Sequence, residues 1–174
     1  MKSHLVKMPS FLLILTLFWF CADKTSNSVK QDIKSFSLTL SNQSFTFDLA
    51  SGEFQIPAIN FRDTIILTSA EKEQIAESFF QERIDTLRGI KYIVPKHNVT
   101  MPDSRNIIKT SLKEKHLSEL YISTQIKDTF DLSQNENNIY KFHQRLIIVL
   151  KANPNYQKCL DTLVKNYKRI PPLM

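Results

Sequence analysis

Hydrophobic and polar residues alternate with a period of two in residues 35–50. A polar stretch at 41–44, made of turn-forming residue types, divides this segment into two halves. Such alternation places the apolar side chains on one face of each strand, so residues 35–50 are predicted to form a β-hairpin with one buried face. The apolar positions are Phe36, Leu38, Leu40, Phe45, Phe47 and Leu49.

Two shorter apolar segments follow a second turn at residues 50–53. Phe54 and Ile56 continue the alternation, and residues 63–67 again contain β-branched residues, while Pro57 interrupts the pattern between them. We therefore expect further strand here and a small antiparallel sheet over the first third of the domain.

The pattern changes to a helical period after Thr68. Thr68 and Glu71 have the spacing of a capping box, in which each side chain accepts a hydrogen bond from a free backbone amide. Apolar side chains then recur at three- and four-residue steps as far as Ile84 and Leu87. Gly89 is placed to end the helix in a left-handed cap, so a helix is predicted from about residue 69 to about 87.

Residues 92–105 follow neither period. Prolines and polar residues interrupt both patterns, so this segment is predicted to be the longest irregular one. Beyond it, residues 106–112 and 117–123 flank a polar turn at 113–115. This arrangement predicts a second hairpin that extends the sheet.

Two further helices are predicted towards the C-terminus. Ser133 and Glu136 form a second capping box, and an apolar stripe that includes His143 follows it. Asn153, directly before a proline, marks the start of the last helix, which two consecutive prolines end. The predicted order of elements is therefore βββ-α-ββ-αα.

This order groups strands before helices and lacks a regular alternation of strand and helix. It predicts an α+β fold, with an antiparallel sheet of about five strands packed on one face against the helices. A length of 174 residues and a hydrophobic content of 42% suit a single compact domain, to which we assign residues 35–174.

Residues 1–21 have the features of a secretory signal peptide. Lys2 and Lys7 give a basic start, and residues 11–20 are dominated by Leu, Ile and Phe. Ten residues of helix would be about 15 Å long, whereas the hydrocarbon core of a bilayer is roughly 30 Å thick. The segment is therefore predicted to direct export rather than to stay as a membrane span.

Cys21 directly follows the apolar run, and residues 22–34 form a polar stretch. This arrangement resembles the N-terminus of bacterial lipoproteins, in which a diacylated cysteine holds the domain at a membrane through a short tether. The resemblance implies lipid attachment at Cys21, with residues 22–34 as the tether. Because Phe20 is bulky where a small residue is usual, two alternatives stay open: cleavage after Ser28, which would release a soluble protein, and an uncleaved anchor.

Composition and charge argue against several classes of protein. The formal net charge is +6, or +4 without Lys2 and Lys7, and basic residues are interspersed with acidic ones. A nucleic-acid partner is not expected, because no run of Lys and Arg reaches about five residues. The chain has two glycines, so a glycine-rich phosphate loop is absent, and two cysteines, Cys21 and Cys159, give no disulfide framework.

His143 and Cys159 both lie on the apolar faces of predicted helices. No second ligand residue stands three or four positions from His143, so it is predicted to be a core histidine, and no metal or cofactor is expected. Cys159 is predicted to be a buried structural thiol. The two residues still form one candidate catalytic pair, because antiparallel packing of the last two helices would bring them close.

The irregular segment contains His97, Asp103, Ser104 and Arg105, residue types that occur in hydrolase sites. A working nucleophile also needs a turn that exposes it, and the G-x-S-x-G elbow is absent. We therefore interpret these four residues as a polar loop that faces a partner.

The signal, the cysteine, the polar tether and the small α+β domain together resemble the small uncharacterised lipoproteins common in Bacteroidetes-type bacteria. The resemblance implies a place in the cell envelope, anchored at the inner or outer membrane and facing the periplasm or the surface, and it carries no activity. Our first hypothesis is a non-enzymatic interaction or scaffold module with an envelope protein as partner. The alternative is a small envelope hydrolase that uses the 92–105 loop or Cys159 with His143.

Overall fold

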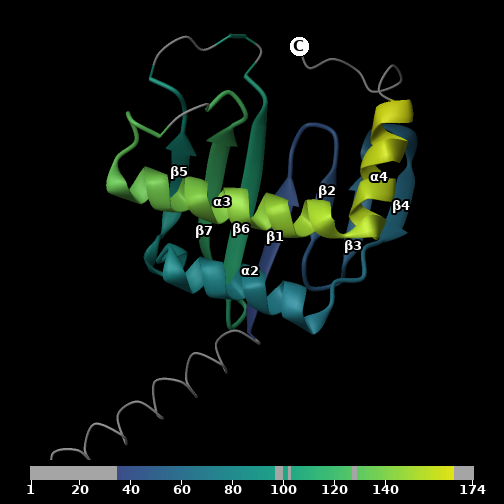
Figure 1. Ribbon diagram of the computed structural model, residues 1–174, viewed down its shortest axis with the longest axis horizontal. Coiled ribbons are helices and arrows are strands. Elements are labelled where there is room, and N and C mark those ends of the chain that lie inside the picture. The colour runs from purple at the N-terminus through teal and green to yellow at the C-terminus, as the bar shows by residue number, and fades with distance from the viewer. Residues whose placement is uncertain (1–34, 97–99, 102, 127–128, 167–174) are drawn as a thin grey trace, which may run out of the picture. The chain divides into compact units, whose positions relative to one another are not determined.

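The computed structural model describes residues 35–96, 100–101, 103–126 and 129–166, and this part of the chain forms one mixed sheet with three α-helices (Figure 1). The predicted α+β class is confirmed. The sheet has seven strands in the order β4-β3-β2-β1-β6-β7-β5. The strands are β1 (Phe36–Ser41), β2 (Thr46–Asp48), β3 (Glu53–Ile56), β4 (Phe61–Thr64), β5 (Gly89–Ile93), β6 (Arg105–Leu112) and β7 (Lys115–Ser123). The helices are α2 (Ser69–Gln81), α3 (Gln134–Ala152) and α4 (Pro154–Lys165), with 3-10 turns η1 (Pro57–Ile59) and η2 (Ile84–Thr86).

Both predicted hairpins are confirmed. β1 pairs antiparallel with β2, with Leu40 opposite Phe47, and β6 pairs antiparallel with β7. Between β6 and β7, Lys113 and Glu114 adopt left-handed φ angles of 51° and 63°. Two successive residues with positive φ make a type I′ turn, whose twist matches that of the flanking strands.

The predicted sheet of about five antiparallel strands in the order βββ-α-ββ-αα is wrong in number, order and direction of strands. Residues 53–67 contain two strands, because Pro57 begins η1 and Asn60, with φ of 50°, turns the chain back on itself. β4 then pairs antiparallel with β3, with Phe61 opposite Ile56.

β4 is thus one strand that was not predicted, and β5 is the other. β5 begins at Gly89, where the first helix was predicted to end, and reaches into the predicted irregular segment at 92–105. β5 runs parallel to β7, and α2 lies in the crossover that carries the chain from β4 at one edge to β5 at the other. Four of its five residues are exposed, so β5 lacks the alternation that marks a half-buried strand.

The capping box of α2 is confirmed: the Glu71 backbone N–H donates to Thr68 Oγ1 at 3.2 Å, and the Thr68 N–H donates to Glu71 Oε2 at 2.7 Å. The predicted far end of this helix is wrong. α2 ends at Gln81 because Arg83 adopts a left-handed φ of 57° and the chain continues as η2. Gly89, also with positive φ, begins β5 instead of capping a helix.

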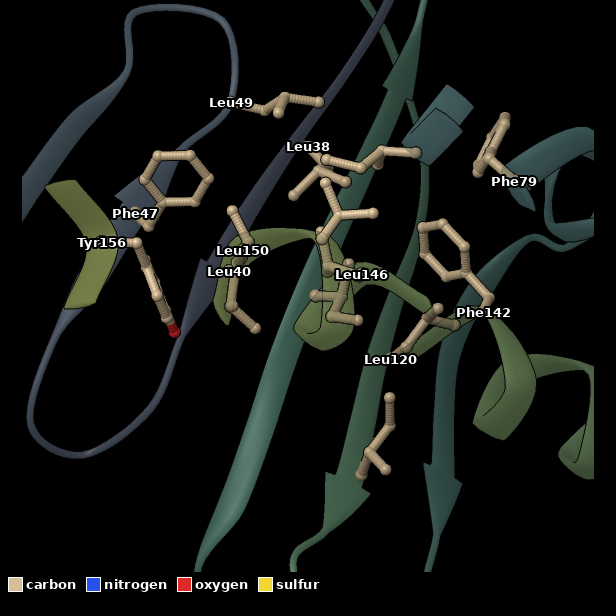
Figure 2. Packing of buried hydrophobic residues seen from close by; sticks show 14 of the residues in the cluster. Leu38, Leu40, Phe47, Leu49, Phe79, Leu120, Phe142, Leu146, Leu150 and Tyr156 are labelled. Atoms are coloured by element: carbon tan, nitrogen blue, oxygen red, sulfur yellow. The ribbon is translucent and has the colours of Figure 1, made fainter. Parts of the chain in front are cut away.

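The three helices lie on one face of the sheet, and the hydrophobic core fills the space between the two layers (Figure 1). α3 begins at its predicted capping box, and Asn153 caps α4 as predicted. No helix in the described ranges has the length and apolar composition needed to cross a membrane. Figure 2 shows side chains of α3 opposite those of the sheet: Phe142, Leu146 and Leu150 against Leu38, Leu40 and Leu120.

Candidate functional site

A cavity of about 280 Å³ lies between α3, α4 and one end of the β6–β7 hairpin. Asn106 near the start of β6 and Ser123 at the end of β7 are close together because the two strands are antiparallel. His143 of α3 and Tyr156 of α4 contribute further polar atoms from the helical layer. Apolar side chains from four segments complete the wall: Phe45, Ile126, Ile147 and Leu160.

His143 is 6% exposed and reaches the sheet from the apolar stripe of α3. Its Nε2 lies 3.0 Å from Nδ2 of Asn106, whereas its Nδ1 is buried without a hydrogen-bond partner. Burial lowers the pKa of His143 from 6.5 to about 4, so the imidazole is neutral at pH 7. Within the described ranges, no group of three His, Cys, Asp or Glu side chains lies close enough to hold a metal ion.

The Asp103 carboxylate is engaged in hydrogen bonds within the chain. Its side chain is 3% exposed, and it accepts hydrogen bonds from Arg105 Nε at 2.8 Å and from Ser123 Oγ at 2.5 Å. These bonds fasten the segment before β6 to the end of β7. Ser104 beside it is exposed, while His97 and the proposed lipid attachment residue Cys21 lie outside the described residues.

Cys159 is fully buried and has no disulfide partner among the described residues. Burial, followed by the negative charge of Asp63, raises the pKa of its thiol to about 11, so the reactive thiolate is scarce at pH 7.

The structure does not pair Cys159 with His143. Lys158, next to Cys159, forms an ion pair of 3.6 Å with Asp63 of β4, whereas His143 contacts Asn106 of β6. β4 and β6 are four strand spacings apart in the sheet, about 19 Å at about 4.8 Å per spacing.

The face of the sheet opposite the helices carries an aromatic pair. Tyr92 of β5 stacks on Tyr121 of β7, with ring centroids 4.9 Å apart and an angle of 27° between the rings. Ile90, Tyr92 and Val94 are 55%, 56% and 38% exposed. We name these three residues together with Tyr121 the tyrosine surface.

Polar groups border the tyrosine surface on the side of β6. The Tyr121 hydroxyl donates to Glu119 Oε1 at 2.7 Å, and Lys109 Nζ lies 3.4 Å from the same oxygen. The bond from Tyr121, followed by the hydrogen bond and charge of Lys109, lowers the pKa of Glu119 below 4.5. An ion pair therefore lies beside the exposed ring of Tyr92 and the half-buried ring of Tyr121.

The sequence analysis missed the tyrosine surface because it placed residue 92 in an irregular segment. Residues 90–94 contain Ile, Tyr, Ile and Val around a single lysine, a composition typical of strands, and this signal could have revealed β5. The stacking of Tyr92 on Tyr121 joins residues 29 positions apart and carries no local signal.

Comparison with known proteins adds no relative. No protein-family model matches this chain, and neither a curated protein nor a solved structure matches it.

Proposed function

We propose that this chain is an envelope protein anchored by a lipid on Cys21, whose domain binds a protein partner and is not an enzyme. The partner contacts the tyrosine surface. The anchor rests on the sequence of residues 1–34, and the binding surface rests on the geometry of β5 and β7.

The observation that carries this proposal is the stacking of the exposed Tyr92 on the half-buried Tyr121. Stacked rings on a sheet present a large, rigid area that loses little side-chain entropy on binding. Tyrosine is enriched at protein interfaces because an apolar ring and a polar hydroxyl meet both kinds of partner group. Ile90 and Val94 extend the apolar area along the edge of the sheet.

The ion pair of Lys109 with Glu119 supplies the polar rim that interfaces place around an apolar centre. Across the sheet, the exposed Arg62 of β4 lies at the opposite edge. The proposed surface is therefore confined to the β5 side, which makes it separable by experiment from the rest of the same face.

The geometry also weighs against the hydrolase alternative. Asp103 is occupied by Arg105 and Ser123, and the Cys159 thiol is buried far from the histidine that would have to activate it. If alanine at Asp103, Ser104 or Cys159 abolished an activity of the folded protein, the non-enzymatic proposal would be wrong.

A photo-reactive phenylalanine analogue at position 92, in the full chain expressed in intact cells, tests the binding proposal. We expect one reproducible adduct with an envelope protein, and we expect Tyr121→Ser in the same chain to lower its yield at least fivefold. The matched control carries the analogue at Arg62 on the opposite edge. Absence of an adduct at position 92, or the same adduct from both positions, would contradict the proposal.

A further inference from the structure

The sheet ends in two edge strands, β4 and β5. Among the described residues, β5 pairs with β7 alone, and β4, at the other end of the strand order, pairs with β3 alone. An edge strand directs the N–H and C=O groups of alternate residues away from its neighbour. Each edge therefore has backbone groups that a further strand could bind.

β4 has the features of a protected edge. Arg62 Nη1 lies 3.7 Å from Glu53 Oε1, and Asp63 Oδ2 lies 3.6 Å from Lys158 Nζ. Charged side chains on an edge strand discourage pairing with another chain. The two charges of β4 are in addition balanced by partners within the chain.

β5 has an edge that is mostly apolar. Ile90 and Tyr92 of the strand and Val94 directly after it are all exposed. An exposed edge with apolar side chains readily pairs with an extended segment of another protein, because new backbone hydrogen bonds form while apolar area is buried. Of the two edges, β5 is therefore the one suited to binding a strand.

Lys91 lies on the other face of β5. Successive side chains of a strand point to opposite faces, so Lys91 shares a face with the buried Ile93 rather than with Tyr92. Lys91 is exposed and forms no ion pair with any residue that the structure describes. A strand added beside β5 would place one set of alternate side chains next to the tyrosine surface and the other set next to Lys91.

The charge of this edge is positive. Glu119 of β7, opposite Ile90, is already paired with Lys109. An acidic segment would therefore be attracted to the free charges of the edge, whereas β5 of a second copy would bring the same positive charges against them. Residues 87–96 contain no acidic residue and three basic ones, all exposed: Arg88, Lys91 and Lys96.

We infer that the envelope partner adds an extended acidic segment to the sheet beside β5, with apolar side chains next to the tyrosine surface and an acidic side chain next to Lys91. This inference rests on the proposed function and specifies how the partner binds. Backbone hydrogen bonds hold the added strand, and the alternation of apolar and acidic side chains selects it.

The binding test uses the full exported chain, with peptides of about eight residues as probes. A peptide of alternating Val and Glu should bind, and it should slow hydrogen exchange of β5 amides at least tenfold while β4 amides exchange as before. A peptide with the same residues in two blocks keeps the charge but loses the alternation, and it should bind at least tenfold more weakly. The same loss is expected for alternating Val and Lys. Equal binding of the three peptides would overturn the inference.

Methylation of the peptide backbone separates strand addition from contact through side chains alone. Only alternate residues of an added strand direct their N–H groups to β5. N-methylation of the Val residues alone and of the Glu residues alone should therefore differ: one should weaken binding at least tenfold, and the other should change it less than about twofold. Equal effects of the two methylation patterns would show that no strand is added.

A charge reversal tests the role of Lys91. Lys91→Glu alters an exposed side chain and should weaken the Val–Glu peptide at least tenfold while it strengthens the Val–Lys peptide. Arg62→Glu, on the β4 edge, is the matched control and should leave both affinities within about twofold. If the two variants bind the peptides alike, Lys91 does not select the segment and the inference is wrong.

Cross-linking at position 92 in intact cells distinguishes failure of this inference from failure of the proposed function. Lys91→Glu in the same chain should lower the yield of the partner adduct at least fivefold. An adduct at full yield would mean that the partner binds the tyrosine surface without an acidic strand, so the inference would be wrong and the proposed function unaffected. An adduct of twice the mass of the chain would show a second copy at β5 and would also overturn the inference. Absence of any adduct contradicts the proposed function itself.

Discussion

Burial of His143 couples the stability of the domain to pH. Its pKa is lowered to about 4 from 6.5, so between these values the unfolded chain binds a proton that the folded chain does not. Stability then rises with pH through this window and is lost as the pH falls from 6.5 to about 4. The difference in pKa corresponds to about 3 kcal/mol.

We therefore predict that His143→Leu removes a pH-dependent part of the free energy of unfolding. Denaturant unfolding at several pH values should show the unmutated chain losing about 3 kcal/mol relative to His143→Leu between pH 6.5 and pH 4. His116→Gln, at an exposed histidine of β7, is the control and should follow the unmutated chain. Parallel curves for the unmutated chain and His143→Leu would show that His143 does not control this window.

Asn153 joins three helices through one buried side chain. Its Oδ1 caps α4 by accepting from the backbone N–H groups of Asn155 and Tyr156, at 3.0 and 3.3 Å. Its Nδ2 donates to the Ile66 carbonyl and to Glu71 Oε1, at 3.0 and 3.2 Å. Asn153 therefore connects the C-terminus of α3 and the start of α4 to the capping box of α2.

Asn153→Ala should lower the free energy of unfolding by about 2 kcal/mol, because it removes an N-cap and leaves a backbone carbonyl without its donor. Chemical denaturation of the purified chain measures this change. Asn155→Ala, at an exposed position in the first turn of the same helix, is the control and should change stability by less than about 0.5 kcal/mol. Equal effects of the two substitutions would refute the role assigned to Asn153.

At the scale of elements, the β2–β3 turn depends on a glycine. Gly52 has φ of +75°, and a Cβ there would lie 2.5 Å from the Ile65 carbonyl oxygen. That oxygen cannot move freely, because the Ile65 N–H donates to the Gly52 carbonyl at 2.8 Å and holds the two segments together. Gly89 has a similar φ of +71°, but a Cβ there would meet nothing within 4 Å.

Gly52→Ala and Gly89→Ala thus separate backbone strain from steric overlap. Gly89→Ala should cost about 1 kcal/mol from the left-handed backbone alone. Gly52→Ala carries the same strain together with a clash against backbone, so thermal or denaturant unfolding should show at least twice that loss. A smaller loss for Gly52→Ala than for Gly89→Ala would contradict the packing described here.

Elements whose signals are local could be predicted from the sequence. Two helix starts could be predicted because each capping box lies within four consecutive residues: Thr68 with Glu71, and Ser133 with Glu136. The alternation in residues 35–50 likewise predicts its hairpin. β5 could not be found in this way, because an exposed edge strand lacks alternation and its partner β7 is distant in sequence. The pairing of Asn106 with His143 spans 37 residues and likewise depends on the assembled sheet.

At the scale of the whole molecule, the two faces of the sheet carry different chemistry. The helix-covered face holds the core and the His143 cavity, whereas the opposite face carries the tyrosine surface at its β5 edge. We propose that a lipid on Cys21 holds the chain at a membrane and thereby keeps the tyrosine surface near the proposed envelope partner.

The mass of the mature N-terminus tests this central claim most directly. The chain isolated from its own cells should begin at Cys21 and carry a diacyl or triacyl adduct on that residue. An unmodified N-terminus at Val29 would instead show cleavage after Ser28 and a soluble protein, and it would contradict the proposed anchor.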